Sequence, residues 1–215
     1  MQAILFDLDG VLVDTLHYHY LAWKKMFEEV GGIVSEHTVL LHEGRNSREI
    51  LPILVKESGV SVPPEELEDF IERKRAYYRK IANVQFYDGV MEVLNKLKSE
   101  NFRLAVVTAC AQKTMEKSLN EEQRNLFDLI QTGDDVTRAK PNPDPYDLAR
   151  KKLGLPKEEC LVVENAPLGI TAAKRAGIKC VAVETTLSKE YLEEADYVIS
   201  NIRELLELPI INHKL

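Results

Sequence analysis

Two aspartates, Asp7 and Asp9, stand two residues apart at the end of a short apolar run, and Gly10 follows them directly. The run covers residues 3–6 and has the unbroken apolar character of a buried parallel strand. In open α/β sheets, ligands bind in the crevice beyond the carboxyl ends of the strands. Both carboxylates are therefore predicted to project into a ligand site, which the glycine lets the backbone approach closely. Taken alone, the same residues also fit an ordinary polar turn.

Two later apolar runs also end in polar residues. Thr108 follows residues 104–107, and Glu164 and Asn165 follow residues 161–163. A hydroxyl at the carboxyl end of a strand can donate a hydrogen bond to a phosphate oxygen, and the backbone N–H groups after it can do the same. Taken alone, a threonine in this position is usually a turn residue.

Lys140 precedes three prolines at alternate positions, Pro141, Pro143 and Pro145, with Asp144 between the last two. The prolines exclude a helix here and hold the loop rigidly, and Asp144 is expected to cap the helix that follows. An isolated lysine is ordinarily a solvated surface charge.

Residues 7–15 read Asp-Leu-Asp-Gly-Val-Leu-Val-Asp-Thr, which resembles the first motif of the haloacid dehalogenase-like phosphotransferases. The similar branch of that family contains β-phosphoglucomutase and small-molecule phosphatases. The resemblance implies that Asp7 is the nucleophile that takes up the phosphoryl group as an aspartyl phosphate, and that Asp9 is the general acid/base. It also implies that Mg²⁺ neutralises the phosphate.

Two later segments match the second and third motifs of the same family. Thr108 would hold the phosphoryl group, with Ala109 beside it at the substrate, and Lys140 would pair with the nucleophile and the transferring phosphate. An ammonium group next to Asp7 would keep that carboxylate ionised and stabilise the charge of the transition state.

Glu164 and the residues after it resemble the fourth motif, in which a Glu-Asp pair precedes Ser-x-x-Gly-Ile. Asn165 stands where the family has aspartate, a departure that keeps an oxygen ligand but removes its charge. We therefore expect Glu164 to ligate the metal more directly, or the metal to bind more weakly than in the family. The residues that the resemblance places at Mg²⁺ are Asp7, Asp9, Glu164 and Asn165.

The composition of the 215-residue chain is that of a globular protein, with 45% hydrophobic and 29% charged residues and a net charge of −7. The negative charge disfavours nucleic acid as a partner, because phosphate backbones attract basic surfaces. No apolar stretch is long enough to span a membrane, and the N-terminus lacks the pattern of a signal peptide. The scattered cysteines Cys110, Cys160 and Cys180 fit free thiols in a reducing cytoplasm. No apolar stripe stands out, so a monomer or a weak homodimer is expected.

Helical and strand-like patterns divide the chain into two parts. Residues 15–30, 46–58 and 63–81 carry apolar side chains at three- and four-residue spacing, which predicts three helices with no strand among them. After residue 89, helical stripes alternate with buried strand-like runs, which predicts a parallel, doubly wound α/β sheet.

We therefore expect a Rossmann-like catalytic core of residues 1–13 and 85–215, with residues 14–84 inserted as an α-helical cap. The linkers at residues 13–14 and 85–88 would act as hinges. The predicted strands of the core are residues 3–6, 104–107, 129–131, 161–163, 180–183 and 197–199.

The cap is expected to carry the residues that choose the substrate. His19 and Trp23 have a spacing similar to that in β-phosphoglucomutase, in which the histidine faces the active site. A surface or packed helix histidine is the alternative. Lys74 lies near the position of the mutase's cap lysine, but the charged run at residues 72–75 is typical of a solvated helix face.

A loop in the cap resembles the substrate-specificity loop of the same branch, and Gly44, Arg45 and Asn46 are its expected substrate residues. In the mutase pattern, Ser-Arg occupies the second and third positions after the glycine. Here Asn46 and Ser47 occupy those positions, which favours a phosphatase over a mutase.

Together these features predict a Mg²⁺-dependent phosphomonoester hydrolase that acts on a small phosphorylated metabolite such as a sugar phosphate. A β-phosphoglucomutase-like mutase would share the first half of the reaction. A catalytically weak binding protein on the same fold is supported only by Asn165. A dehalogenase would need neither Mg²⁺ nor the acid Asp9, so Asp9 disfavours it.

Overall fold

The core of the protein is a sheet of six parallel strands, seen in a computed structural model that describes residues 1–212. The strands are β1 (Ala3–Phe6), β2 (Arg103–Val107), β3 (Leu129–Gln131), β4 (Cys160–Glu164), β5 (Lys179–Val183) and β6 (Tyr197–Ile199). Their order across the sheet is β3-β2-β1-β4-β5-β6, so the order reverses between β1 and β4. This confirms the predicted doubly wound α/β fold. Residues 213–215 of the predicted core lie outside the described range.

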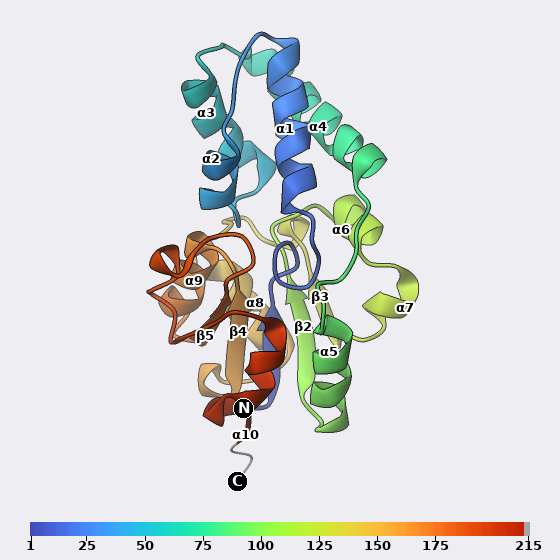
Figure 1. The fold of residues 1–215 in the computed structure, drawn as a ribbon, viewed down its shortest axis with the longest axis vertical. Helices are drawn as coiled ribbons and strands as arrows, with labels where there is room; N and C mark the ends of the chain where they lie inside the picture. The colour runs from blue at the N-terminus through green and yellow to red at the C-terminus, as the bar shows by residue number, and fades with distance from the viewer. Residues whose placement is uncertain (213–215) are drawn as a thin grey trace.

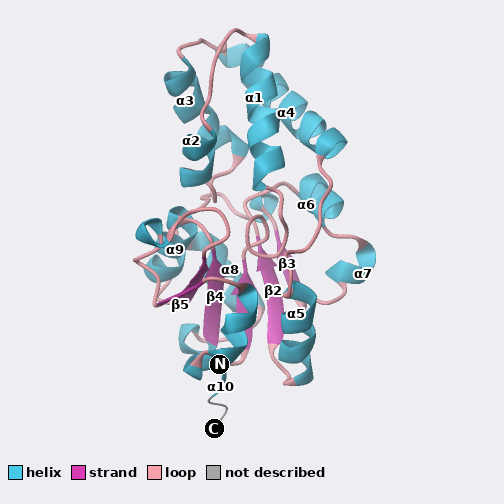
Figure 2. Ribbon diagram, in the orientation of Figure 1, coloured by secondary structure: helices cyan, strands magenta, loops and turns pink. Residues whose placement is uncertain are grey.

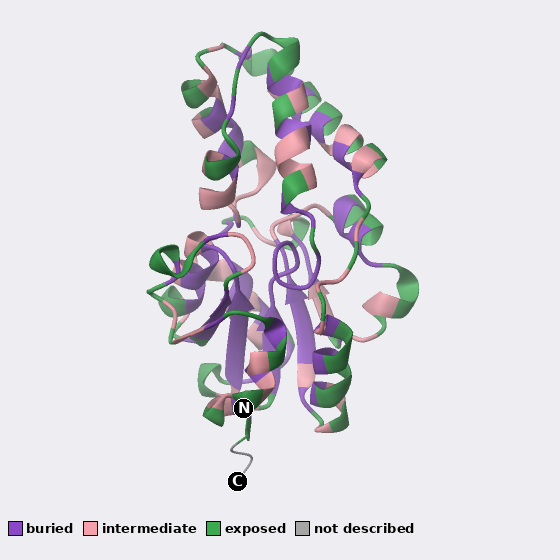
Figure 3. Ribbon diagram, in the orientation of Figure 1, coloured by how far each residue is buried: buried purple, intermediate pink, exposed green. Residues whose placement is uncertain are grey.

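Helices cover both faces of the sheet (Figure 2), and the strands are buried between them (Figure 3). Ile4, on one face of β1, belongs to the apolar cluster that includes α5 (Val90–Ser99). Leu5, on the other face, packs with α8 (Asp144–Lys152) and α9 (Pro167–Arg175). Because both faces of the sheet are covered, the residues on either face of β1 can be apolar, which accounts for the unbroken apolar run in the sequence.

Four helices form the cap, which lies beyond the carboxyl ends of the strands (Figure 1). They bury an apolar core of their own, to which Trp23, Phe27, Leu54 and Phe70 contribute. The cap is therefore a packed unit that can hold side chains over the sheet. Its helices are α1 (Leu16–Glu29), α2 (Glu36–Leu41), α3 (Ser47–Ser58) and α4 (Leu67–Ile81).

The two chain segments that join the cap to the core run side by side. The Asp14 N–H donates to the Gln85 carbonyl at 3.0 Å, and the Tyr87 N–H donates to the Leu12 carbonyl at 3.0 Å. Two adjacent crossings allow a cap to turn about one axis, so the hinge prediction has a geometric basis.

The structure differs from the predicted elements in two places. Helix α2 was not predicted, because six residues are too few for a helical period to stand out. Asp144 was wrongly predicted to cap α8: Pro143 occupies the N-cap position, and the Asp144 carboxylate lies inside the first turn, where it pairs with Arg138.

No helix among residues 1–212 is long and apolar enough to cross a membrane. The remaining elements are the helices α6 (Gln112–Ser118), α7 (Glu121–Arg124) and α10 (Pro209–Asn212), and the 3-10 helices η1 (Pro64–Glu66), η2 (Gly133–Asp135), η3 (Lys157–Glu159), η4 (Lys189–Tyr191) and η5 (Ile202–Glu207).

Candidate active site

Three charged side chains meet out of contact with solvent at the carboxyl ends of β1 and β4. The Lys140 Nζ donates to Asp7 Oδ1 at 2.8 Å and to Glu164 Oε1 at 2.7 Å, and none of the three side chains is more than 4% exposed. The Tyr146 hydroxyl donates to the same Glu164 oxygen at 2.7 Å. Asp7 and Glu164 thus flank the reversal of strand order, which is where open α/β sheets bind ligands.

The charges of this group control one another. Burial raises the pKa of Asp7 to about 7, although the Lys140 ammonium opposes the effect. Burial by itself would lower the pKa of Lys140, but the charges of Asp7 and Glu164 outweigh it and raise that pKa above its usual range. Lys140 is therefore a permanent positive charge beside Asp7. A dication bound at Asp7 would lower the pKa of that carboxyl again.

Asp9 faces the cap. Its Oδ1 accepts a hydrogen bond from the Thr15 hydroxyl at 2.5 Å and lies 3.4 Å from His19 Nε2 on α1. Burial acts to raise the pKa of Asp9, but the hydrogen bonds from His19 and Thr15 and the charge of Lys74 outweigh it and lower that pKa. The ring of His19 stacks on Tyr78 with 4.1 Å between centroids, which fixes its orientation toward Asp9.

Lys74 on α4 extends this chain of contacts, since its Nζ lies 2.8 Å from His19 Nδ1. An ammonium group can only donate, so Nδ1 accepts and Nε2 carries the ring proton toward Asp9. Burial lowers the pKa of Lys74 to about 8. Burial and the charge of Lys74 together lower the pKa of His19, which favours the neutral ring.

The expectation that Lys74 is solvated is therefore wrong. Its side chain is buried, and its ammonium lies 4.9 Å from the centre of the Trp23 ring. Lys74 falls on the same side of α4 as Phe70 and Tyr78, four residues away in each direction, and this side packs on α1. The four-residue spacing of Phe70, Lys74 and Tyr78 indicates that Lys74 lies on the buried side of the helix, but the charged residues beside it hide this pattern.

Thr108 follows β2 at the same edge of the sheet and is buried. Its N–H donates to the Gln131 carbonyl at 3.0 Å, and its hydroxyl accepts from the Cys110 N–H at 3.1 Å. The Ala109 carbonyl oxygen lies so close to Gly133 that a Cβ there would be 2.3 Å away. Packing against a glycine therefore holds this loop near the ends of β2 and β3.

Asn165 has the one feature here that fits a hard cation. The residue is 0% exposed, its Nδ2 donates to Thr186 Oγ1 at 3.1 Å, and its Oδ1 has no hydrogen-bond partner. A buried amide oxygen without a partner is costly, and Mg²⁺ prefers oxygen ligands of this kind. Asp7 and Asn165, which follow the neighbouring strands β1 and β4, are therefore the side chains that would hold Mg²⁺.

Glu164, in contrast, has both carboxylate oxygens occupied. Oε1 accepts from Lys140 and Tyr146, and Oε2 accepts from the backbone N–H groups of Asn165 and Ala166. This arrangement favours Glu164 as the residue that positions Lys140 rather than as a direct metal ligand. Among residues 1–212, no group of three or more His, Cys, Asp or Glu side chains is arranged to hold a metal, so a site here would combine the Asp7 carboxylate with neutral oxygens.

Comparison with known proteins agrees with this geometry. Residues 4–183 match the haloacid dehalogenase-like hydrolases. The chain belongs to this family. The validoxylamine A 7'-phosphate phosphatase of Streptomyces hygroscopicus subsp. limoneus is 36% identical over 209 residues, 95% of each chain. The phosphorylated carbohydrates phosphatase of Thermotoga maritima is 31% identical over 182 residues, 83% of each chain.

The solved structure of β-phosphoglucomutase from Clostridium difficile is similar to this haloacid dehalogenase-like hydrolase, with a TM-score of 0.85 and 27% identity. The match covers 95% of this chain and 93% of that one. The predicted family, fold and enzyme class, that of a haloacid dehalogenase-like phosphatase, are confirmed.

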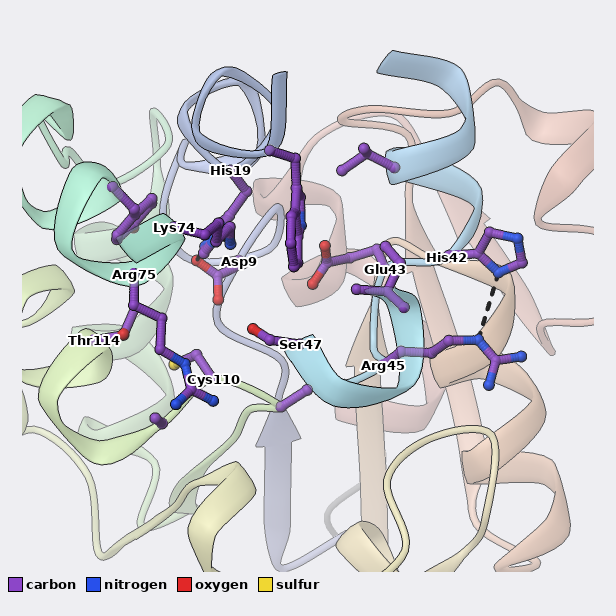
Figure 4. A pocket seen from close by; sticks show the side chains of 16 residues that line it. Asp9, His19, His42, Glu43, Arg45, Ser47, Lys74, Arg75, Cys110 and Thr114 are labelled. Carbon is purple, nitrogen blue, oxygen red and sulfur yellow. Dashed lines mark hydrogen bonds and ion pairs between the residues drawn. The ribbon is translucent and has the colours of Figure 1, made fainter. Parts of the chain in front are cut away.

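A pocket lies between the cap and Asp9 of this hydrolase (Figure 4). Its volume of about 50 Å³ accommodates only a few water molecules. Residues from both parts of the chain line it, among them Asp9, His19, Trp23, Glu43, Arg45, Ser47, Lys74, Arg75, Ala109, Cys110 and Thr114.

Glu43 is a pocket residue that the sequence analysis missed. Its carboxylate points into the pocket toward Asp9 (Figure 4). Burial, followed by the charges of Asp9 and Asp7, raises the pKa of Glu43 to about 8. Its position directly before Gly44 was the only signal in the sequence, and it did not show which way the side chain points.

The three residues of the predicted specificity loop have three different roles. Gly44 has a φ of 93°, and a Cβ there would lie 3.2 Å from the Lys140 side chain, so this loop of the cap rests on Lys140. Arg45 lines the pocket, but its Nε donates to His42 Nδ1 at 3.4 Å, away from Asp9 (Figure 4). The Asn46 side-chain oxygen caps α3 by accepting from two backbone N–H groups, so this oxygen is committed to the helix rather than to substrate.

Proposed function

We propose that this chain hydrolyses phosphate monoesters of small metabolites, sugar phosphates in particular, through an aspartyl phosphate on Asp7 and with Mg²⁺ as cofactor. The observation that carries the proposal is the buried contact of 2.8 Å between Lys140 and Asp7, with Asp9 two residues on and held by His19 of the cap. Asp7 thereby has a permanent cation beside it. A protein that only bound a phosphosugar would not need the second carboxylate.

In the first step, a carboxylate oxygen of Asp7 attacks phosphorus in line with the leaving oxygen. The bond from phosphorus to the leaving oxygen breaks, and that oxygen takes a proton from Asp9. Lys140 and Thr108 bind the phosphoryl oxygens, where charge develops. The product is an aspartyl phosphate and a free alcohol.

In the second step, water attacks the phosphorus of the aspartyl phosphate, and Asp9 accepts its proton. The bond to Asp7 breaks, which returns both carboxyl groups to their starting states and releases phosphate. The lowered pKa of Asp9 favours its ionised form, which suits the base of this step, whereas the acid of the first step has to be the protonated form. Mg²⁺, when bound, supplies further charge neutralisation at the phosphate.

The pocket favours a polyhydroxylated leaving group. Glu43, Lys74 and Ser47 present hydrogen-bonding groups around the space above Asp9, and hydroxyl groups of a sugar can pair with all of them. Two similar proteins are named as a validoxylamine A 7'-phosphate phosphatase and a phosphorylated carbohydrates phosphatase. Because its pKa is raised to about 8, the Glu43 carboxyl is mostly protonated at neutral pH and can donate a hydrogen bond to a sugar hydroxyl.

The test is a screen of phosphate monoesters for phosphate release, with an assay for conversion of β-glucose 1-phosphate to glucose 6-phosphate run in parallel. Each assay is run with and without glucose 1,6-bisphosphate. We expect phosphate release from sugar monophosphates without the bisphosphate. Isomerisation without phosphate release would instead establish the β-phosphoglucomutase activity that one similar solved structure is named for.

Changing Asn165→Asp should lower the Mg²⁺ concentration that gives half-maximal rate, by about tenfold. The added carboxylate brings a negative charge to the cation site while keeping an oxygen in place, so kcat at saturating Mg²⁺ should change little. The measurement is a Mg²⁺ titration of the initial rate at fixed ionic strength. An unchanged or higher requirement would remove Asn165 from the ligand set.

Changing Glu43→Gln should lower kcat/KM for sugar phosphates by about three- to tenfold, the effect of one hydrogen bond in a buried site. The rate with an aryl phosphate, which has no hydroxyls to bind, should stay within about twofold. Glu36→Gln is the matched control, since Glu36 is an exposed carboxylate of the same cap. Equal losses on both substrates would place Glu43 in the structure of the cap rather than at the substrate.

A further inference from the structure

The loop after β5 contacts both strand ends that carry the candidate metal ligands. The Thr185 hydroxyl donates to the Gly10 carbonyl, directly after Asp9 in the chain. The next residue, Thr186, accepts the hydrogen bond from Asn165 Nδ2 at 3.1 Å. Two adjacent hydroxyls of one loop thus brace the ends of β1 and β4.

Asn165 has little freedom in this position. It is 0% exposed, and a Cβ on Gly10 would lie 2.1 Å from its Nδ2, so the amide nitrogen packs directly against the glycine backbone. With Nδ2 held by Thr186, the side-chain oxygen is the atom left without a partner.

An amide differs from a carboxylate in a way that makes this hydrogen bond matter. A carboxylate has two equivalent oxygens, so either orientation offers a ligand to a cation. An amide has one oxygen and one NH₂ group, and turning it by half a rotation would present two N–H donors to the cation instead. An asparagine at a cation site therefore needs a neighbour that fixes its orientation.

We propose that Thr186 is a positioning residue that orients Asn165 so that its oxygen faces the cation of the active site. The inference rests on the Mg²⁺ site of the proposed function and adds a residue to it. Thr186 acts through Asn165 and touches neither the substrate nor the reacting atoms. Groups that orient metal ligands in this way commonly change metal affinity by about 10- to 100-fold when they are removed.

The test measures metal binding directly, without turnover. Mn²⁺, which takes the same oxygen ligands as Mg²⁺, is titrated into the whole protein, and the free ion is followed by its paramagnetic resonance signal. Added Mg²⁺ should displace the bound Mn²⁺. The variants are Thr186→Val, Thr186→Ser, Asn165→Asp and the double variant of Thr186→Val with Asn165→Asp, with melting temperatures recorded without metal as a check on the fold.

Thr186→Val should weaken Mn²⁺ binding by about tenfold, because valine keeps the shape of threonine but cannot accept the hydrogen bond. Thr186→Ser keeps the hydroxyl and should bind within about threefold of the parent. In the Asn165→Asp background, Thr186→Val should also change the affinity by no more than about threefold, since the carboxylate needs no orientation. The control Thr171→Val removes a hydroxyl that pairs with Glu194 on the surface of α9, and should have no effect.

Equal losses from Thr186→Val in the parent and in the Asn165→Asp background, or unchanged affinity in Thr186→Val, would overturn the assignment of Thr186. The assignment would also be overturned, in favour of a purely structural role, if Thr186→Val lost Mn²⁺ binding together with a fall in the metal-free melting temperature and Thr186→Ser restored neither. If the parent binds no Mn²⁺ and Mg²⁺ has no effect on its rate, the metal site of the proposed function fails as a whole, a result distinct from the others.

Discussion

Replacing Asp7 by asparagine is expected to lower kcat by about 10⁴-fold or more, because the amide is a poor nucleophile. Among the described residues, Glu164 is the other carboxylate that accepts a hydrogen bond from Lys140. Glu164 cannot substitute, since both of its oxygens are occupied by other donors. The variant should also lose the acid-stable phosphoenzyme that the parent forms when quenched during turnover.

The measurement is trapping of radiolabelled phosphate on the protein from a labelled sugar phosphate, together with the steady-state rate. Asp69→Asn is the control, because Asp69 is an exposed aspartate of α4 and its loss should leave both readouts unchanged. Asp9→Asn should behave differently from both, with some phosphoenzyme formed from good leaving groups but slow release of phosphate. Full activity of Asp7→Asn would end the proposed mechanism.

Replacing Lys140 by methionine is expected to affect both activity and stability. Rates should fall by about 10²- to 10³-fold, because a preorganised cation at the phosphoryl group is lost. Removing one partner of a buried ion pair costs about 3–5 kcal/mol, since the remaining charges are left without compensation. For a chain of this size, that loss corresponds to a fall in Tm of roughly 10 °C or more. Lys151→Met, at an exposed lysine, should change neither quantity.

The loss of stability in Lys140→Met should depend on pH with a definite sign. Asp7 and Glu164 would face each other in the core without a cation, so burial and mutual repulsion would raise the pKa of Asp7 further above that of the unfolded chain. The folded state then binds a proton that the unfolded state releases, so stability falls as pH rises. Chemical denaturation of the variant at about pH 5.5 and pH 8 should show greater stability at the lower pH. A flat profile would mean that the site admits water once the lysine is gone.

Local sequence is enough to predict the sheet and the polar residues at its edge. Buried parallel strands need apolar residues on both faces, so the apolar runs before Asp7, Thr108 and Glu164 can be recognised as strands from the sequence alone. Parallel strands of one sheet end at one edge, and the polar residues that follow them had to converge there. The motif around Lys140 was specific enough to place a cation among them.

The contribution of the cap, in contrast, depends on how its helices pack. The sequence directly around Lys74 is charged throughout and gives no sign that this residue is buried. Lys74 is buried because α4 packs against α1 with Phe70 and Tyr78 on the same side. Asn46 and Glu43 are close in the chain, yet one caps a helix and the other enters the pocket. Side-chain direction in a loop depends on the backbone that its neighbours impose, and the local sequence does not contain it.

The metal site shows the same division within a single residue. The sequence showed that Asn165 departs from the family pattern, and chemistry limited it to a neutral oxygen ligand. It could not show Thr186, which is 21 residues away in the chain and reaches Asn165 because β4 and β5 are neighbours in the sheet. The sequence therefore shows which side chains are available at this site. The packing of separate strand ends sets which of these side chains face one another, because contacts between distant segments exist only in the folded chain.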